Sequence, residues 1–314
     1  MARTPIMADG LPDALIGMFD GFEILPWDVA ENSESLRRAA GILIYAHPDV
    51  DGDLMDRMPL LKVISNHGVG VDHVDVAAAQ SRGIPVGNTP GCLDAATADM
   101  TMALLMAAAR NVVVGDHYAR SPEFVHYDPS ILIGREVTGS TLGIVGMGRI
   151  GRQVAKRAHG FDMKILYHNR NQIPDAENEN RATYSALDDL LRESDFVTLN
   201  CPLTSETTGL ISSERLQLMK PSAILVNMAR GPVVNTDDLY AALKSRRIAC
   251  AALDVTDPEP LPRDHPLLKL GNVIIAPHLG SASDRTRRRM MGISIDNLRA
   301  GLAGQKLPHE VTTR

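Results

Sequence analysis

A glycine-rich turn in the middle of the chain constrains the fold more than any other feature. The segment TLGIVGMGRIG, residues 141–151, runs from an apolar, partly β-branched stretch into Gly146, Gly148 and Gly151 at G-x-G-x-x-G spacing. Gly146 permits a tight turn, Gly148 lets a diphosphate approach the backbone, and Gly151 lets the next helix pack against the sheet. Apolar residues of that next helix fall on one face. The pattern predicts the strand, phosphate-binding turn and helix of a dinucleotide-binding domain.

The composition is that of a soluble globular protein with about two domains, at 314 residues, 44% hydrophobic and 22% charged. A net charge of −6 argues against a nucleic-acid surface, and we expect the basic run 285–289 to be a solvated helix face. Cys92, Cys201 and Cys250 lack metal-type spacing, which suits a reducing compartment. No apolar stretch has the length of a signal peptide or a membrane span. We therefore expect a cytoplasmic enzyme that binds no nucleic acid, membrane or metal.

The first ninety residues alternate short apolar runs with helical patterns. This alternation predicts a parallel sheet with helices on both faces, in a small α/β domain. The expected strands are 22–25, 41–45, 61–65 and 84–86, and the expected helices are 33–39, 54–58 and 74–81.

The alternation resumes after the glycine-rich turn and predicts a doubly wound sheet of six strands. A helix over 281–302 returns to the first domain, because the nucleotide sheet is complete by Ala276. The expected strands are 141–145, 163–167, 196–199, 223–226, 251–255 and 273–276, with helices at 186–192, 214–219 and 237–245.

Residues 92–114, at the junction of the two halves, are apolar nearly all round. A helix without a polar face must be buried. We expect this helix to connect the domains and to pack against a second subunit in a homodimer. Burial inside one large monomer is the alternative.

Three residues that could carry chemistry follow strands in the second half. Arg230 follows AILVN, Glu259 lies in LDVTDPEP, and His278 lies in IIAPHLGSA. In an open parallel sheet, ligands bind at the carboxyl ends of the strands, so all three side chains could face one crevice. Taken singly, each has a structural alternative: a surface ion pair, a turn cap or a loop histidine. Their occurrence together at one sheet edge favours a catalytic site.

The chain resembles the D-isomer-specific 2-hydroxyacid dehydrogenase family. Within that family it most resembles the glyoxylate/hydroxypyruvate reductase and 2-ketogluconate reductase branch. One departure is Asp99, where the family more often has glutamate. We expect it to alter a helix or domain-junction contact and to leave the active site undisturbed. The resemblance extends over nearly the whole length and lies in NHGVGVDHVDV, VGNTPGCLDAATAD, GSTLGIVGMGRIGRQVA, NMARGPVVNTDDLYAAL, ALDVTDPEPLPRDHPLL and NVIIAPHLGSAS.

The resemblance implies an α/β fold of two doubly wound parallel-sheet domains with a cleft between them. Residues 1–91 and 280–314 would form a flavodoxin-like substrate-binding (catalytic) domain. Residues 92–279 would form a Rossmann NAD(P)-binding domain.

The family's catalytic residues match three positions of this sequence. Arg230 would bind the carboxylate of a 2-oxo acid and polarise its carbonyl, since a planar fork of donors suits both tasks. His278 would be the general acid that protonates the carbonyl oxygen as hydride reaches the carbon. Glu259 would hold the imidazole through its other nitrogen and favour its protonated form.

The resemblance also implies further substrate contacts. The backbone of Val69 and Gly70, in HGVGVD, resembles the family's second carboxylate-binding loop, which offers N–H groups. Ser281 lies beside the histidine loop and would also contact substrate. His47 and Tyr127 are weaker candidates for lining the pocket.

Asp254, in ALDV, resembles the aspartate that holds the nicotinamide carboxamide. The other cofactor contacts implied by the family lie in the glycine-rich turn, at the end of the second strand and in the loops after later strands. They are Thr97, Gly146, Met147, Gly148, Arg149, Ile150, His168, Asn169, Arg170, Cys201, Pro202, Thr207, Met228, Ala229 and Gly280.

The adenosine end of the nucleotide site departs from the NAD-preferring pattern. NAD-binding domains place an acidic residue about 20 residues beyond the glycine-rich turn, where it binds the ribose 2′-hydroxyl. Here the second strand ends YHNRN, residues 167–171, and no acid occurs before Asp175. Arg170 and Asn169 would instead donate to a 2′-phosphate. We therefore expect NADP(H) to be preferred, with NAD(H) possible.

The sequence thus predicts an NADPH-dependent reductase of small 2-oxo acids, such as glyoxylate, hydroxypyruvate or 2-ketogluconate. An enzyme of the phosphoglycerate dehydrogenase type is one alternative, although many of these carry a regulatory domain that is absent after Leu302. A nucleotide-sensing, co-repressor-like binding module is another. Long terminal tails for recruiting partners are missing, but an intact Arg-Glu-His set does not exclude this alternative.

Overall fold

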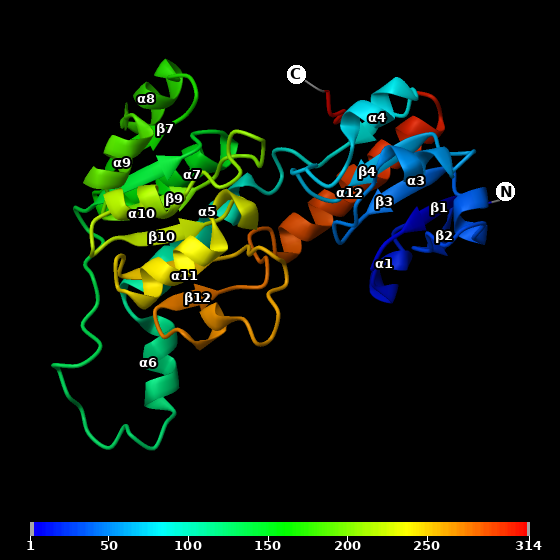
Figure 1. Ribbon diagram of the computed structural model, residues 1–314. Coiled ribbons are helices and arrows are strands. Elements are labelled where there is room, and N and C mark those ends of the chain that lie inside the picture. Colours follow the sequence, from blue (N-terminus) through cyan, green and yellow to red (C-terminus); the bar gives the residue numbers. More distant parts are fainter. Residues whose placement is uncertain (1–2, 313–314) are drawn as a thin grey trace. The chain divides into compact units, whose positions relative to one another are not determined.

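The computed structural model describes residues 3–312, and the chain divides into two compact units (Figure 1). Unit 1 contains the residues up to Leu93 and those from Ser283 onward, and unit 2 is Asp94–Ala282. The boundaries expected from the sequence, after residues 91 and 279, lie within three residues of these. Each unit is built on a parallel sheet, as the sequence predicted.

Unit 1 has a five-stranded sheet in the order β2-β1-β3-β4-β5, which is the flavodoxin-like order. Alternate residues of its strands point to opposite faces, so Ile42 and Ile44 enter one apolar core while Leu43 enters another. The strands are β1 (Thr4–Ala8), β2 (Phe22–Pro26), β3 (Gly41–Ile44), β4 (Val63–Asn66) and β5 (Val86–Gly87).

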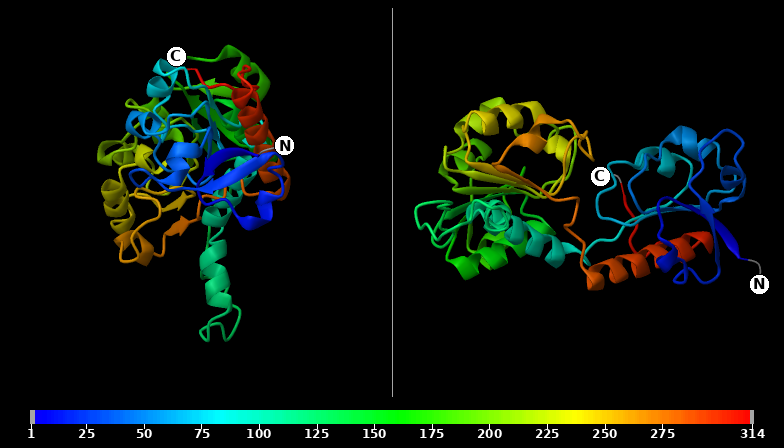
Figure 2. Two further views of the ribbon diagram at one scale, coloured as in Figure 1. Left: turned by 90° about the vertical axis from the view of Figure 1, so that its right-hand side faces the viewer. Right: turned by 90° about the horizontal axis from the view of Figure 1, so that it is seen from below.

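The helices of unit 1 cover both faces of its sheet, and α12 lies along one of them (Figure 2). Side-chain caps start several of these helices: Ser33, Asp51 and Ser283 each accept a hydrogen bond from a backbone N–H of the first turn. The helices are α1 (Asp13–Ile16), α2 (Glu34–Arg38), α3 (Gly52–Asp56), α4 (Val76–Ser81) and α12 (Asp284–Leu302).

Strand β1, which was not predicted, lies between β2 and β3. Pro5 explains the omission, because a proline inside a short run argues against a central strand. In the structure Pro5 keeps its place in the ladder through its carbonyl oxygen, which accepts from the N–H of Ala40 at 2.8 Å.

Unit 2 has a seven-stranded parallel sheet in the order β12-β11-β10-β9-β6-β7-β8. The chain runs outward from β6 in both directions, as in a Rossmann fold. The strands are β6 (Thr141–Val145), β7 (Lys164–His168), β8 (Ala182–Tyr184), β9 (Phe196–Leu199), β10 (Ile224–Asn227), β11 (Cys250–Leu253) and β12 (Val273–Ile275).

The prediction of six strands in this sheet was wrong, because it omitted β8. This strand is a three-residue edge strand, too short to display a period of two. Its pairing with β7 becomes visible only in the folded chain, where Leu166 lies opposite Thr183.

Each face of the seven-stranded sheet has its own apolar core. Helices α5 and α7 pack together in one core, and α9, α10 and α11 cover the other face (Figure 1). The helices of unit 2 are α5 (Asp94–Ala109), α6 (Val112–Ala119), α7 (Arg149–Ala158), α8 (Pro174–Asn180), α9 (Leu187–Glu193), α10 (Ser213–Leu218) and α11 (Thr236–Lys244), with short 3₁₀ turns at His159–Phe161, Gly231–Val233 and Pro266–Lys269.

The single helix expected over residues 92–114 is in fact two helices, α5 and α6. Asn111 adopts a left-handed φ of 52° between them, a conformation that asparagine tolerates better than most residues. The returning chain ends α5, because the N–H of Arg135 bonds the carbonyl of Ala109 at 2.6 Å. Gly134 permits this approach, since a Cβ there would lie 2.4 Å from the same carbonyl oxygen.

Asp99 forms a contact between helices, as expected for this departure from the family pattern. Its carboxylate pairs with Arg157 of α7 at 2.6 Å. Within residues 3–312 no single helix has the length and apolar character of a membrane span; α5 and α6 meet that test only as a pair bent by 59°.

Candidate active site

The glycine-rich turn follows β6 and packs tightly against neighbouring backbone. Gly146 has a φ of 99°, and a Cβ on it would lie 2.6 Å from the backbone nitrogen of Cys201. A Cβ on Gly151 would lie 2.1 Å from the carbonyl oxygen of Gly146. Both positions therefore require glycine, one for its backbone angle and one for the close approach of the helix.

Helix α7 starts directly at this turn. Gly148 is its N-cap and gives no side-chain cap, so the first N–H groups of a ten-residue helix are available to an anion. Open space surrounds Gly148, since a Cβ on it would meet no atom within 4 Å. Arg149 and Ile150 form the first turn of α7. The residues present therefore fit the diphosphate of a dinucleotide.

The end of β7 positions the predicted adenosine contacts. The side-chain oxygen of Asn169 accepts from the N–H of Met147 at 2.8 Å and so ties the end of β7 to the glycine-rich turn. His168 bonds the carbonyl of Ser185 through Nδ1 at 3.0 Å. Arg170 is exposed beyond the strand. Hydrogen bonding within its own loop lowers the pKa of the Glu206 carboxyl, and the charge of Arg170 lowers it by a smaller amount.

Arg230 comes directly after β10 and is held by its own strand. Asn227, the last residue of β10, accepts from the N–H of Ala229 and donates to the carbonyl of Arg230 at 2.9 Å. Its buried amide thus fixes the backbone on both sides of the turn. Asn227 was not among the predicted site residues, although its position at a strand end is the signal that could have identified it.

The segment after Arg230 packs tightly against the loop that carries Glu259. A Cβ on Gly231 would lie 1.9 Å from the carbonyl oxygen of Thr256, so only glycine fits. Thr236 adds a hydrogen bond from its hydroxyl to the carbonyl of Asp257 at 2.8 Å. These contacts were not predicted, because they join parts of the chain that lie far apart in sequence.

Glu259 and His278 form the pair that the family resemblance implied. The Oε1 atom of Glu259 lies 2.7 Å from Nδ1 of His278, while Oε2 accepts a longer bond from the N–H of Thr256. A carboxylate only accepts, so Nδ1 carries the proton of this hydrogen bond. Burial raises the pKa of Glu259, but the hydrogen bond and charge of His278, with the charge of Arg230, lower it below its ordinary value overall.

Asp254 anchors the loop that carries His278. Asp254 is buried, with 2% of its surface exposed. Its carboxylate accepts hydrogen bonds from the N–H groups of Leu279 at 2.6 Å and Gly280 at 2.7 Å. Its carbonyl accepts from the N–H of His278, which adopts a left-handed φ of 56°. Burial raises the pKa of Asp254, although both N–H bonds act against this. This anchoring role was not part of the sequence prediction.

The structure brings several predicted cofactor residues together around Gly280. A Cβ on Gly280 would lie 3.0 Å from Oδ2 of Asp254, 3.3 Å from Met228 and 3.4 Å from Thr97. These residues come from α5 and from the ends of β10 and β11. Their meeting point lies at the carboxyl edge of the sheet, on the loop that carries His278.

The remaining predicted residues lie in loops of both units. Thr207 donates to the carbonyl of Pro202 at 2.7 Å, and burial raises the pKa of the Cys201 thiol to about 11. Ser281 lies in the loop that carries His278, between β12 and α12. Val69 belongs to unit 1, in the loop after β4, where Asn88 donates to its carbonyl at 2.9 Å. Gly70, next to Val69, accepts from Asn66 at 2.8 Å.

A dinucleotide-binding sheet with an Arg-Glu-His set at its carboxyl edge defines a nicotinamide-dependent oxidoreductase. Residues 102–280 match the model of the D-isomer specific 2-hydroxyacid dehydrogenase NAD-binding domain. The chain belongs to this family and is an oxidoreductase of this kind.

Relatives over nearly the whole chain support the same assignment. The glyoxylate reductase of Korarchaeum cryptofilum is 49% identical over 263 residues, covering 83% of this chain and 79% of the relative. That of Pyrococcus horikoshii is 43% identical over 309 residues, covering 95% and 92%.

Solved structures show the same two-domain fold. An NADPH-dependent glyoxylate/hydroxypyruvate reductase from Sinorhizobium meliloti, in complex with NADP and malonate, is 30% identical with a TM-score of 0.90, covering 99% of this chain and 97% of that one. A D-lactate dehydrogenase from Aquifex aeolicus, in complex with NAD and lactic acid, is 28% identical with a TM-score of 0.87, covering 98% and 99%.

Proposed function

We propose that this protein is an NADPH-dependent reductase that converts small 2-oxo acids, glyoxylate and hydroxypyruvate above all, to D-2-hydroxy acids. The observation that carries the proposal is the arrangement of Arg230, Glu259 and His278 at the carboxyl edge of the dinucleotide-binding sheet. The names of the relatives support the substrate class.

In this mechanism the bound nicotinamide supplies hydride, and the protein positions the 2-oxo acid and supplies a proton. Arg230 binds the carboxylate and polarises the carbonyl, and its backbone is fixed by Asn227. Val69 and Gly70 of unit 1 offer backbone N–H groups to the carboxylate, and Ser281 offers its hydroxyl.

His278 donates the proton from Nε2 to the carbonyl oxygen. Its Nδ1 proton stays on the side of Glu259, whose low pKa keeps that carboxyl ionised near neutral pH. The hydrogen bond to Glu259 fixes the orientation of the imidazole ring for this transfer. Asp254 holds the loop that carries this ring.

The preference for NADPH rests on the end of β7. Arg170 is exposed there, and residues 167–171 contain no acidic residue that could bind a ribose 2′-hydroxyl. A cation favours a 2′-phosphate by charge-assisted hydrogen bonding. Glu206 partly offsets this, since its carboxylate lies within the electrostatic reach of Arg170.

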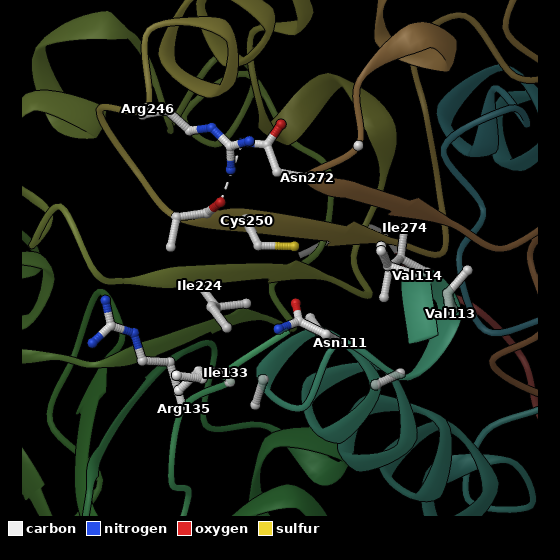
Figure 3. Close-up of a pocket in the computed structure, with 16 residues that line it drawn as sticks. Asn111, Val113, Val114, Ile133, Arg135, Ile224, Arg246, Cys250, Asn272 and Ile274 are labelled. Atoms are coloured by element: carbon white, nitrogen blue, oxygen red, sulfur yellow. Dashed lines mark hydrogen bonds between the residues drawn. The ribbon is translucent and has the colours of Figure 1, made fainter. Parts of the chain in front are cut away.

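A second copy of the chain is the partner that we propose for α6 and the segment after it. This part of unit 2 extends away from the sheet (Figure 1). It exposes apolar side chains, among them Val125 at 78% and Ile133 at 77%. A cavity of about 350 Å³ lies beside it, lined by residues that include Asn111, Arg246 and Cys250 (Figure 3). Large exposed apolar patches often mark protein–protein contacts, so these exposed side chains favour a partner at this segment.

The substrate class and the role of His278 are tested together. We expect purified protein to lower the absorbance of reduced nicotinamide when glyoxylate or hydroxypyruvate is added, with 2-ketogluconate as a further test substrate. His278→Ala should reduce turnover by roughly 10² to 10⁴, the contribution of a general acid, and leave NADPH binding intact by fluorescence titration. Arg230→Ala should also raise KM.

His309→Ala, which removes a histidine of unit 1, is the matched control and should keep wild-type turnover. A wild-type protein inactive on all three acids would refute the proposed substrates. Near-normal turnover of His278→Ala would remove this residue from the mechanism.

Cofactor preference is tested at Arg170. We expect Arg170→Ala to weaken NADPH by roughly 10- to 100-fold, because a hydrogen bond to a charged group contributes about 1.5–3 kcal/mol. NADH, which lacks the 2′-phosphate, should change little. Steady-state kinetics with both cofactors measures this, with Arg192→Ala on α9 as a control that removes an exposed arginine elsewhere. Equal use of both cofactors by the wild type, or equal loss of both in the variant, contradicts the prediction.

The dimer is tested by light scattering. The wild type should have twice the mass of one chain at micromolar concentration, and the double variant Val125→Asp, Ile133→Asp should have the mass of one chain, because two buried carboxylates would oppose association. A wild type with the mass of a single chain would rule out the dimer.

A further inference from the structure

The carboxyl edge of the unit 1 sheet carries three histidines that the mechanism above does not use. His47 follows β3, and His67 and His73 follow β4. His67 is buried, its ring stacked on Tyr45 with centroids 5.0 Å apart. Burial lowers the pKa of His67 to about 4, with smaller contributions from the charges of Arg287 and His47.

His47 is held in a backbone conformation that its side chain disfavours. Its φ is 65°, in the left-handed region. The buried carboxylate of Asp9 fixes the preceding backbone, accepting from the N–H of Tyr45 at 2.5 Å and of Ala46 at 2.6 Å. Strained conformations persist where the surroundings impose them and are frequent at ligand sites, which makes His47 a candidate for function.

His73 orients the ring of His47 and is itself oriented by Asn66. The amide nitrogen of Asn66 donates to the carbonyls of Gly68 and Gly70, so its oxygen is the acceptor for Nε2 of His73 at 3.0 Å. The proton of His73 therefore lies on Nε2. The rings of His47 and His73 meet edge to face, with centroids 4.9 Å apart and an interplanar angle of 90°.

The imidazole of His47 lies beside the loop that we propose for the substrate carboxylate. A Cβ on Gly68 would lie 3.7 Å from Nε2 of His47. Gly68 precedes Val69, and its carbonyl also accepts from the N–H of Thr89 at 2.9 Å, which fixes the turn. His47 is nevertheless exposed, so its ring can meet a ligand bound at Val69 and Gly70.

We propose that His47 is a specificity-determining residue that hydrogen-bonds a hydroxyl on C3 of the 2-oxo acid, with His73 as its positioning residue. The inference rests on the proposed function. In a 2-oxo acid, C3 is two bonds from the carboxylate carbon, so a group beside the carboxylate loop reaches the C3 substituent. An imidazole can donate to a hydroxyl or accept from it. Glyoxylate has no C3, and C3 of pyruvate is a methyl group without a hydroxyl.

Steady-state kinetics with hydroxypyruvate, pyruvate and glyoxylate tests the inference. His47→Ala should lower kcat/KM for hydroxypyruvate on the order of 10-fold, the value of one neutral hydrogen bond, mainly through KM. Its kcat/KM for glyoxylate and pyruvate should stay within about twofold. His47→Asn should recover part of the loss, because asparagine accepts the left-handed backbone and keeps a hydrogen-bonding group. His73→Ala should lower hydroxypyruvate selectivity less than His47→Ala does.

Asn32→Ala is the matched control, since Asn32 is another exposed residue of unit 1 with a left-handed φ, of 61°. It should leave the ratio of hydroxypyruvate to glyoxylate activity unchanged. The inference is overturned if His47→Ala affects hydroxypyruvate and glyoxylate equally, if it leaves hydroxypyruvate unaffected, or if the wild type reduces glyoxylate alone. A wild type that reduces none of these acids overturns the proposed function instead.

Discussion

The buried carboxylate of Asp254 holds the part of the structure on which the catalytic arrangement depends. Both of its oxygens accept backbone N–H groups of the loop after β12, and its own carbonyl accepts from the N–H of His278. His278 can therefore keep a left-handed φ and direct Nδ1 at Glu259. The resemblance of Asp254 to nicotinamide-binding aspartates does not reveal that it anchors this loop. The anchoring role is compatible with a cofactor contact, because Thr97, another predicted cofactor residue, also lies beside Gly280.

The same kind of anchor recurs in unit 1, where it supports the loop that carries His47. Asp9 lies at the end of β1, as Asp254 lies at the end of β11, and each buried carboxylate accepts two backbone N–H groups. In both cases the anchored loop carries a histidine with a left-handed φ, His47 or His278. A buried carboxylate is costly to desolvate, so its hydrogen bonds must be satisfied, and this requirement fixes the loop geometry.

Residue patterns predicted the two parallel sheets, because apolar runs are local signals, and the family resemblance implied the pairing of Glu259 with His278. They did not predict β1 or β8, where a proline and a three-residue length weaken those signals. They also did not predict the anchoring contacts of Asp9, whose partners lie more than thirty residues away in sequence. Such contacts depend on strand order, which no local pattern contains.

The central claim is that Glu259 holds the imidazole of His278 in position for proton transfer, and a comparison of Glu259→Gln with Glu259→Ala tests it most directly. Glutamine can keep the bond to Nδ1 through its side-chain oxygen, whereas alanine removes that bond. The account predicts that Glu259→Ala lowers kcat for glyoxylate by roughly 10- to 100-fold, that Glu259→Gln retains part of the activity, and that both variants still bind NADPH. A wild-type kcat in Glu259→Ala would contradict the account.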